Sequence, residues 1–248
     1  MLDSPVKTMK TMLKRPLRAL GFNVSRWPAR LDPSYRRSIF LAHYGVDLVV
    51  DVGANTGQYA STLREWGYRA AILSLEPMAE EFALLAERAR RDGQWTAIKF
   101  AAGSQAGSET INVAANSVSS SMRPMLERHR GAAPTSFTVR EETIEVRRLD
   151  DLVLSDVRAA AHPFLKIDTQ GYEDRVLDGA PLILAEVVGI ELEMSIVELY
   201  EGQCLWEELH ARLQRAGFEL SGVSSGFWDR RTGDGLQFDA TYRSQAVR

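Results

Sequence analysis

The sequence predicts an α/β fold built on a doubly wound, mostly parallel sheet. In the first half, short apolar runs typical of strands buried on both faces occur at residues 48–52, 71–75 and 97–101. Helices are expected between them, at about residues 57–66 and over residues 82–89, where apolar side chains recur at helical spacing. Strands alternating with helices form right-handed parallel crossovers, so we expect helices on both faces of the sheet.

The second half predicts a less regular middle followed by renewed alternation. The expected elements, in chain order, are strands at 109–113 and 143–147 around a Ser/Asn-rich loop and a helix near 125–130, a strand at 164–167, a helix at 173–177, a strand at 187–192, a helix ending at Gly217, and β segments at 218–228 and 236–242. Turn-rich residues 231–235 separate the last two segments, which predicts an antiparallel hairpin at the sheet edge.

Composition indicates an ordinary globular protein. The chain has 248 residues, 45% hydrophobic and 25% charged, with a formal net charge of −3. The lone Cys204 excludes an internal disulfide and a cysteine-built zinc site, and it indicates a reducing, cytoplasmic location. A near-neutral balance argues against nucleic acid as a partner. Residues 46–248 contain no Pro- or Ser-rich linker, which predicts a single domain.

The charge is unevenly distributed along the chain. Residues 1–48 carry nine basic and three acidic side chains, a net +6, which leaves −9 for the rest. Lys7, Lys10, Lys14 and Arg18 share one face of a possible helix, a pattern typical of peripheral membrane contact, although Pro16 opposes a continuous helix. Residues 1–45 are therefore predicted to form a basic arm. A frayed arm with a short helix covering the core, or an arm over the substrate, are the alternatives.

A glycine-containing loop follows the first predicted strand, where doubly wound sheets bind ligands. The segment at 51–57 reads DVGANTG, so its spacing is D-x-G-x-x-x-G and not the G-x-G-x-x-G that seats a diphosphate. Asp51 would repel a diphosphate and suits a cationic group. Glu76 ends the second strand, where a carboxylate can accept both hydroxyls of a ribose. Adenosine ribose together with an aminoacyl cation describes S-adenosylmethionine.

Four stretches of the sequence carry recognisable motifs: DVGANTG at 51–57, LEP at 75–77, LKIDTQGYE at 165–173 and VLDGA at 176–180. Together these residues resemble the FkbM family of S-adenosylmethionine-dependent methyltransferases. Supporting matches are residues 119–121, 148–152, 191–193 and 199–202, together with Asp239. The similarity runs in order over about residues 46–243. The chain departs from the commonest pattern at Gln170, where the family often has glutamate.

The resemblance implies the class I methyltransferase sheet, with six parallel strands and one antiparallel strand, and methylation of a hydroxyl on a small-molecule sugar, polyketide or glycolipid acceptor. The residues predicted to bind the cofactor are Asp51, Gly53, Ala54, Asn55, Gly57, Tyr59, Glu76, Pro77, Ala102 and Asp168.

Four residues are candidates for the chemistry of transfer. Asp168 ends the fourth strand at the same sheet edge as Asp51, so it can reach the cofactor's amino group or the acceptor hydroxyl. Glu173 opens the next helix, where it can equally act as a cap, and Glu191 closes the fifth strand. His129 follows the Ser-rich loop and has a pKa suited to a base near neutral pH. Asp168, Glu173 and Glu191 could together hold Mg²⁺, with a metal-free site as the alternative.

Two other function classes remain open. A nucleotide-dependent oxidoreductase or epimerase is opposed by Asp51 and by the absence of G-x-G-x-x-G. A non-catalytic adenosine-binding module predicts cofactor binding without turnover.

Overall fold

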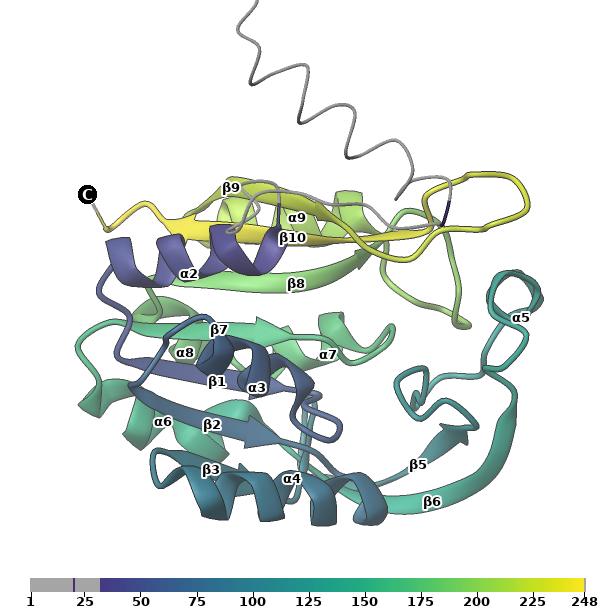
Figure 1. The fold of residues 1–248 in the computed structure, drawn as a ribbon, viewed down its shortest axis with the longest axis horizontal. Helices are drawn as coiled ribbons and strands as arrows, with labels where there is room; N and C mark the ends of the chain where they lie inside the picture. The colour runs from purple at the N-terminus through teal and green to yellow at the C-terminus, as the bar shows by residue number, and fades with distance from the viewer. Residues whose placement is uncertain (1–19, 21–31, 248) are drawn as a thin grey trace, which may run out of the picture.

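A seven-stranded sheet forms the centre of the protein (Figure 1). The structure, a computed structural model, describes residue 20 and residues 32–247. The strand order is β3-β2-β1-β7-β8-β10-β9, with β1 (Leu48–Val52), β2 (Ala71–Leu75), β3 (Trp95–Ile98), β7 (Pro163–Ile167), β8 (Gly189–Ser195), β9 (Phe218–Ser225) and β10 (Gln237–Ser244). Strand β10 is antiparallel to β8 and β9, and the other pairs are parallel. The predicted sheet and its C-terminal hairpin are confirmed.

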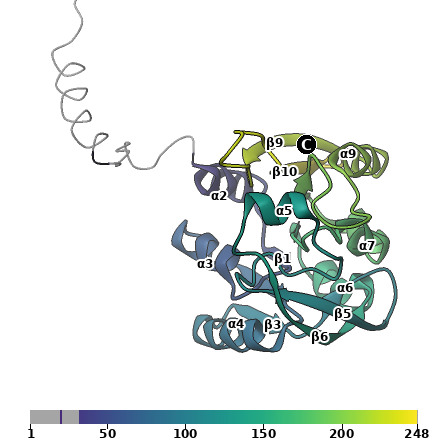
Figure 2. The same cartoon turned by 90° about the vertical axis from the view of Figure 1, so that its right-hand side faces the viewer.

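Helices cover both faces of this sheet, as the view from the carboxyl ends of its parallel strands shows (Figure 2). One face carries α2 (Pro33–His43), α3 (Gln58–Glu65) and α4 (Ala79–Asp92), and the other carries α6 (Leu149–Ala159), α7 (Glu173–Asp178), α8 (Pro181–Glu186) and α9 (Trp206–Arg215). Leu41 and Leu85 pack with Phe164 in the first layer, and Val153 and Leu209 belong to the core of the second. The strands are buried because both layers exclude water from them.

A smaller sheet stands at the carboxyl ends of the central strands (Figures 1 and 2). It has the order β4-β6-β5, with β4 (Ala101–Ala102), β5 (Gly107–Ala114) and β6 (Thr138–Arg147), and α5 (Glu127–Ala132) lies between β5 and β6 in the chain. Ile111, Val113 and Ile144 form a separate apolar cluster with Met78. This small sheet gives the site a wall that the central sheet cannot supply.

The predicted third strand was wrong in its extent. Strand β3 begins at Trp95 and ends at Ile98, whereas residues 101–102 pair with β6 in the small sheet. The buried Trp95 indole donates from Nε1 to Ser74 Oγ at 2.9 Å, which anchors the start of the strand. The chain thus passes from one sheet to the other within a run that reads as one strand.

The basic cluster at Lys7, Lys10, Lys14 and Arg18 lies outside the described residues. The part of the predicted arm that is described forms α2, whose Leu41 is buried in the core. Asp32 caps this helix by accepting from the Ser34 amide at 2.8 Å. No helix in residues 32–247 is long and apolar enough to cross a membrane.

Candidate active site

A cavity of about 380 Å³ lies at the carboxyl ends of β1, β2, β7 and β8. The predicted residues that line it are Gly53, Ala54, Asn55, Tyr59, Glu76, Pro77, Ala102, Asp168 and Glu191. The structure does not place Asp51, Gly57, Glu173 or His129 in its lining.

Two glycines shape the loop between β1 and α3. Gly53 has a φ of 79°, and a Cβ there would lie 1.8 Å from the carbonyl oxygen of Asp168. Gly57 has a φ of 88°, and its Cβ would lie 2.6 Å from the Trp95 ring. Any other residue would force the loop away from β7 or β3. The glycines therefore let the β1 loop lie directly against the loop that carries Asp168.

Glu76 lies on the cavity wall directly after β2. Its two carboxylate oxygens accept from the amides of Asn55, at 2.8 Å, and Met78, at 2.9 Å. Burial raises the pKa of Glu76 to about 7 although these amides oppose the shift. Since each carboxylate oxygen can accept more than one hydrogen bond, a fixed Glu76 can still bind the two hydroxyls of a ribose.

The wall next to Glu76 is lined by small and apolar side chains. They include Pro77, Phe100, Ala102, Ile111 and Met122. Such a lining suits a flat, weakly polar group, and an adenine ring attached to a ribose on Glu76 fits that description.

The strand register builds a polar row across the face of the sheet that α2 and α3 cover. Asp51 lies opposite Ser74 and Lys166, Lys166 lies opposite Glu191, and Glu191 lies opposite Thr241. Side chains directly opposite each other on neighbouring strands interact. One row therefore joins residues that are far apart in the sequence.

Lys166 forms ion pairs with two carboxylates, one from Asp51 on β1 and one from Asp168 directly after β7. Its Nζ lies 3.6 Å from Asp51 Oδ1 and 3.2 Å from Asp168 Oδ2. Burial alone would lower the pKa of Lys166, but Asp168 and Asp51 outweigh it and raise the pKa. Asp51 is completely buried and also accepts from Ser74 Oγ at 3.1 Å. Asp51 thus balances Lys166 beneath the cavity, and Asp168 is the carboxylate that reaches the cavity.

Gln170 connects three parts of the site. Its Nε2 donates to Asp168 Oδ1 at 2.8 Å and to Glu193 Oε2 at 2.6 Å, and its Oε1 lies 2.9 Å from the Tyr200 hydroxyl. An ionised glutamate could not donate to either carboxylate. Glutamine in place of the family's common glutamate therefore suits this site, because its amide can donate to Asp168 and Glu193.

Glu173 lies outside the cavity lining and makes its contacts within the loop that follows β7. Its Oε1 accepts from the amides of Thr169, at 2.8 Å, and Gly171, at 3.2 Å. Burial raises the pKa of Glu173 to about 7. The side chain is turned into the loop that follows β7, and holds that loop in shape beneath the cavity wall.

His129 also lies outside the cavity lining. It is buried, and its ring packs against Tyr200 and Phe227 with centroids 5.2 Å apart in each case. Burial lowers the pKa of His129 to about 4. A neutral imidazole in an apolar cluster outside the cavity lining is a packing residue, so the structure does not support His129 as the base.

Sequence reasoning missed Arg37. This α2 residue lines the cavity and binds Glu191 of β8, with Nε 2.9 Å from Oε2 and Nη2 2.6 Å from Oε1. Its guanidinium also lies over the ring of Tyr59, 4.6 Å from the centroid. Arg37 is identified only by its contact with β8 in the folded protein, because the sequence around it contains no motif.

A loop between β5 and α5 covers the cavity and is tied to the residues beneath it. Ser121 Oγ donates to the Gln170 carbonyl at 2.7 Å, and the Tyr200 hydroxyl lies 3.0 Å from the Ser119 carbonyl. Asn55 Nδ2 donates to Ser117 Oγ at 3.1 Å. We call residues 117–123 the covering loop.

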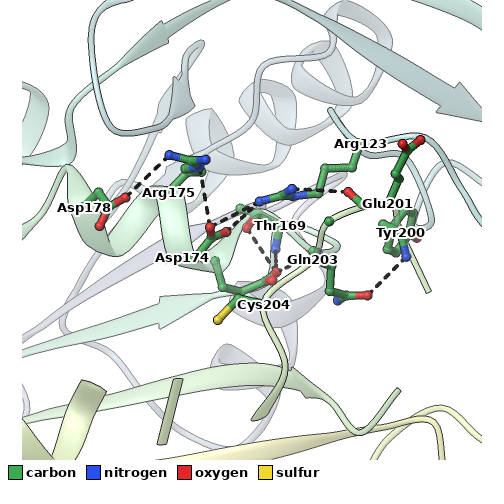
Figure 3. Close-up of polar contacts among 12 residues, drawn as sticks. Arg123, Thr169, Asp174, Arg175, Asp178, Tyr200, Glu201, Gln203 and Cys204 are labelled. Carbon is green, nitrogen blue, oxygen red and sulfur yellow. Dashed lines mark hydrogen bonds and ion pairs between the residues drawn. The ribbon is translucent and has the colours of Figure 1, made fainter. Parts of the chain in front are cut away.

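Arg123 fixes the far end of the covering loop (Figure 3). It forms an ion pair with Asp174 at 3.1 Å and donates to the carbonyl of Glu201 at 3.2 Å. The covering loop, α7 and the segment after β8 therefore hold one another in place above the site.

In the described part of the chain, no group of three or more His, Cys, Asp or Glu side chains is arranged to hold a metal ion. The three carboxylates considered for Mg²⁺ have separate partners: Lys166 for Asp168, backbone amides for Glu173 and Arg37 for Glu191. We therefore assign no metal to the site.

Comparison with known proteins gives one family. Residues 51–220 match the model described as the methyltransferase FkbM domain. A methyltransferase FkbM from Methylobacillus flagellatus KT has 18% identity and a TM-score of 0.49 over 80% of this chain and 43% of that one, so the chain spans less than half of that protein. Magnesium protoporphyrin IX methyltransferase from Synechocystis PCC 6803 has 11% identity and a TM-score of 0.47 over 99% of both chains. No protein of curated function matches the chain.

Proposed function

The chain belongs to the FkbM methyltransferase family, whose members use S-adenosylmethionine, and on that premise we propose that it methylates a hydroxyl of a sugar, glycolipid or polyketide-type acceptor. The observation that carries the proposal is that Glu76 and Asp168 line one cavity on either side of the Gly53 loop. These two carboxylates match the two ends of the cofactor, a ribose and a cationic aminoacyl group.

The residues present fit S-adenosylmethionine. Glu76 would accept the ribose hydroxyls, the small apolar wall near Ala102 would hold the adenine, and Asp168 would bind the ammonium. Asp168 is fixed by Lys166 and Gln170, so it is ready to hold a cation without rearranging. When bound, the cofactor supplies a methyl group on a sulfonium, which needs no metal for activation.

The rest of the cavity is polar and suits an acceptor with several hydroxyls. Ser34, Thr62, Arg37 and Asp239 line it beyond the predicted cofactor residues. Such groups donate to or accept from hydroxyls in fixed directions, and orientation of the reacting oxygen is a large part of catalysis. Contact of the basic arm with an anionic membrane that carries a glycolipid acceptor remains part of the proposal.

The proposal is tested by locating the transferred methyl. The protein is incubated with methyl-labelled S-adenosylmethionine and with fractionated sugar, glycolipid and polyketide pools. We expect label in one fraction, as a methyl ether by mass spectrometry and NMR. Label on nitrogen or carbon would contradict hydroxyl methylation. Binding of NAD in place of S-adenosylhomocysteine in calorimetry would favour the oxidoreductase alternative.

A further inference from the structure

Asp239 is the carboxylate on the cavity wall that has no fixed partner. It lies on β10, and its side chain makes no hydrogen bond or ion pair with any residue in 32–247. The other three carboxylates in the lining are occupied: Glu76 by two amides, Asp168 by Lys166 and Gln170, and Glu191 by Arg37. Of these four carboxylates, Asp239 is therefore the one whose oxygens are free to accept a proton.

The groups around Asp239 favour a carboxylate that takes up protons. Its cross-strand partners are Glu193 on β8 and Ser224 on β9. The charged groups that face it are Glu191 and Glu193 from β8, Lys166 from β7, Asp168 directly after β7, and Arg37 from α2, with Tyr59 from α3 nearby. Burial, then Glu191 and Asp168, raise the pKa of Asp239 to about 7, and Arg37 and Lys166 oppose this only in part.

We propose that Asp239 is the general base, and that its carboxylate takes the proton of the acceptor hydroxyl as the hydroxyl oxygen bonds to the methyl carbon. The carbon–sulfur bond of the donor breaks with its electron pair remaining on sulfur. The products are the methyl ether, S-adenosylhomocysteine and protonated Asp239, which releases its proton to solvent. This inference rests on the proposed hydroxyl methylation. A base must reach the proton that it accepts, and the position of Asp239 in the cavity lining allows this.

The same geometry assigns Asp168 a different role. Lys166 and Gln170 both donate to Asp168, so its carboxylate oxygens already have fixed partners. Asp168 is therefore suited to the cofactor's ammonium, and Asp239 is left for the acceptor.

The test compares wild type with Asp239→Asn, Asp168→Asn and the control Asp151→Asn, which changes an exposed carboxylate on α6. In the acceptor fraction that takes up label, we expect Asp239→Asn to lower the transfer rate about 100-fold or more. Its affinity for S-adenosylhomocysteine in calorimetry should stay within about twofold of wild type. Asp168→Asn should lose that affinity, and Asp151→Asn should change neither quantity.

Two pH profiles complete the test. The wild-type rate should rise to a plateau above about pH 7, and Asp239→Asn should lose this inflection. The melting temperature of Asp239→Asn relative to wild type should increase from about pH 5 to about pH 8, because a raised carboxyl pKa makes the folded wild type less stable as the pH rises. If Asp239→Asn keeps both the wild-type transfer rate and the inflection near pH 7, Asp239 is not the general base. A wild type that labels no hydroxyl would refute the proposed function, and the assignment with it.

Discussion

Arg37 of α2 and Glu191 of β8 form a bidentate ion pair that joins this helix to the sheet. Their side chains are only 12% and 5% exposed, and the shortest contact is 2.6 Å. Arg37 lies outside residues 51–220, the segment that matches the family model. The helix before the matched segment is therefore an integral part of the cavity wall.

Replacing Arg37 with methionine should destabilise the protein by about 3–5 kcal/mol, since it leaves Glu191 buried without a counterion. Denaturant unfolding measures this. Arg90→Met is the matched control, because its ion pair with Glu87 is exposed to solvent and should contribute little to stability. The Arg37→Met/Glu191→Met double variant should recover part of the loss. Equal, small effects at both arginines would contradict a structural role for the buried pair.

Glu76→Gln should weaken S-adenosylhomocysteine binding about tenfold or more, on the scale of about 1.5–3 kcal/mol for a charged hydrogen bond. The NH₂ group of the new glutamine would also face the backbone N–H of Asn55 or of Met78, and two donors cannot pair. Part of the effect will therefore appear as lower stability. Glu80→Gln, an exposed change on the neighbouring helix, is the control. Titration calorimetry measures both, and unchanged affinity in Glu76→Gln would remove the ribose assignment.

Much of this fold follows from local sequence patterns. The runs at 48–52 and 71–75 are strands with those bounds, and the carboxylates that follow β2 and β7, Glu76 and Asp168, reach the cavity as expected. Strand ends are visible in a sequence because apolar runs stop there. The placement of Glu76 and Asp168 could therefore be predicted.

What could not be predicted depends on contacts between distant segments. Arg37 and Asp239 enter the site through the packing of α2 and the register of β10. Asp51 follows the first strand's apolar run as expected, but the register places Lys166 opposite it, and the two side chains pair beneath the cavity. His129 resembles a base in sequence, yet its surroundings in space are apolar.

Tyr200→Phe should loosen the covering loop. The hydroxyl lies between the Ser119 carbonyl and Gln170 Oε1, so its removal leaves buried acceptors unpaired, at a cost of about 1–2 kcal/mol. Hydrogen exchange in residues 117–123 should become faster. Tyr242→Phe also removes the hydroxyl of a buried tyrosine, one that contacts His210, and should leave exchange in this loop unchanged. Equal exchange rates in both variants would mean that Tyr200 does not hold the loop.

Stability should depend on pH through Glu173. Its pKa is about 7 in the folded protein and 4.5 in the reference state, so the folded protein binds more protons between these values. The contribution of Glu173 to stability is therefore fully present below about pH 4.5 and is lost as the pH rises toward 7, by up to about 3 kcal/mol. Glu173→Gln should flatten this part of the profile in denaturant unfolding. An unchanged slope would show that Glu173 is not the source.

A crystal structure of this protein with S-adenosylhomocysteine would show directly whether Glu76 and Asp168 hold the cofactor. We expect the ribose hydroxyls within hydrogen-bond distance of Glu76, the amino group on Asp168, and open space between the sulfur and Asp239. Binding elsewhere, or an amino group that displaces Lys166 from Asp51, would contradict this assignment.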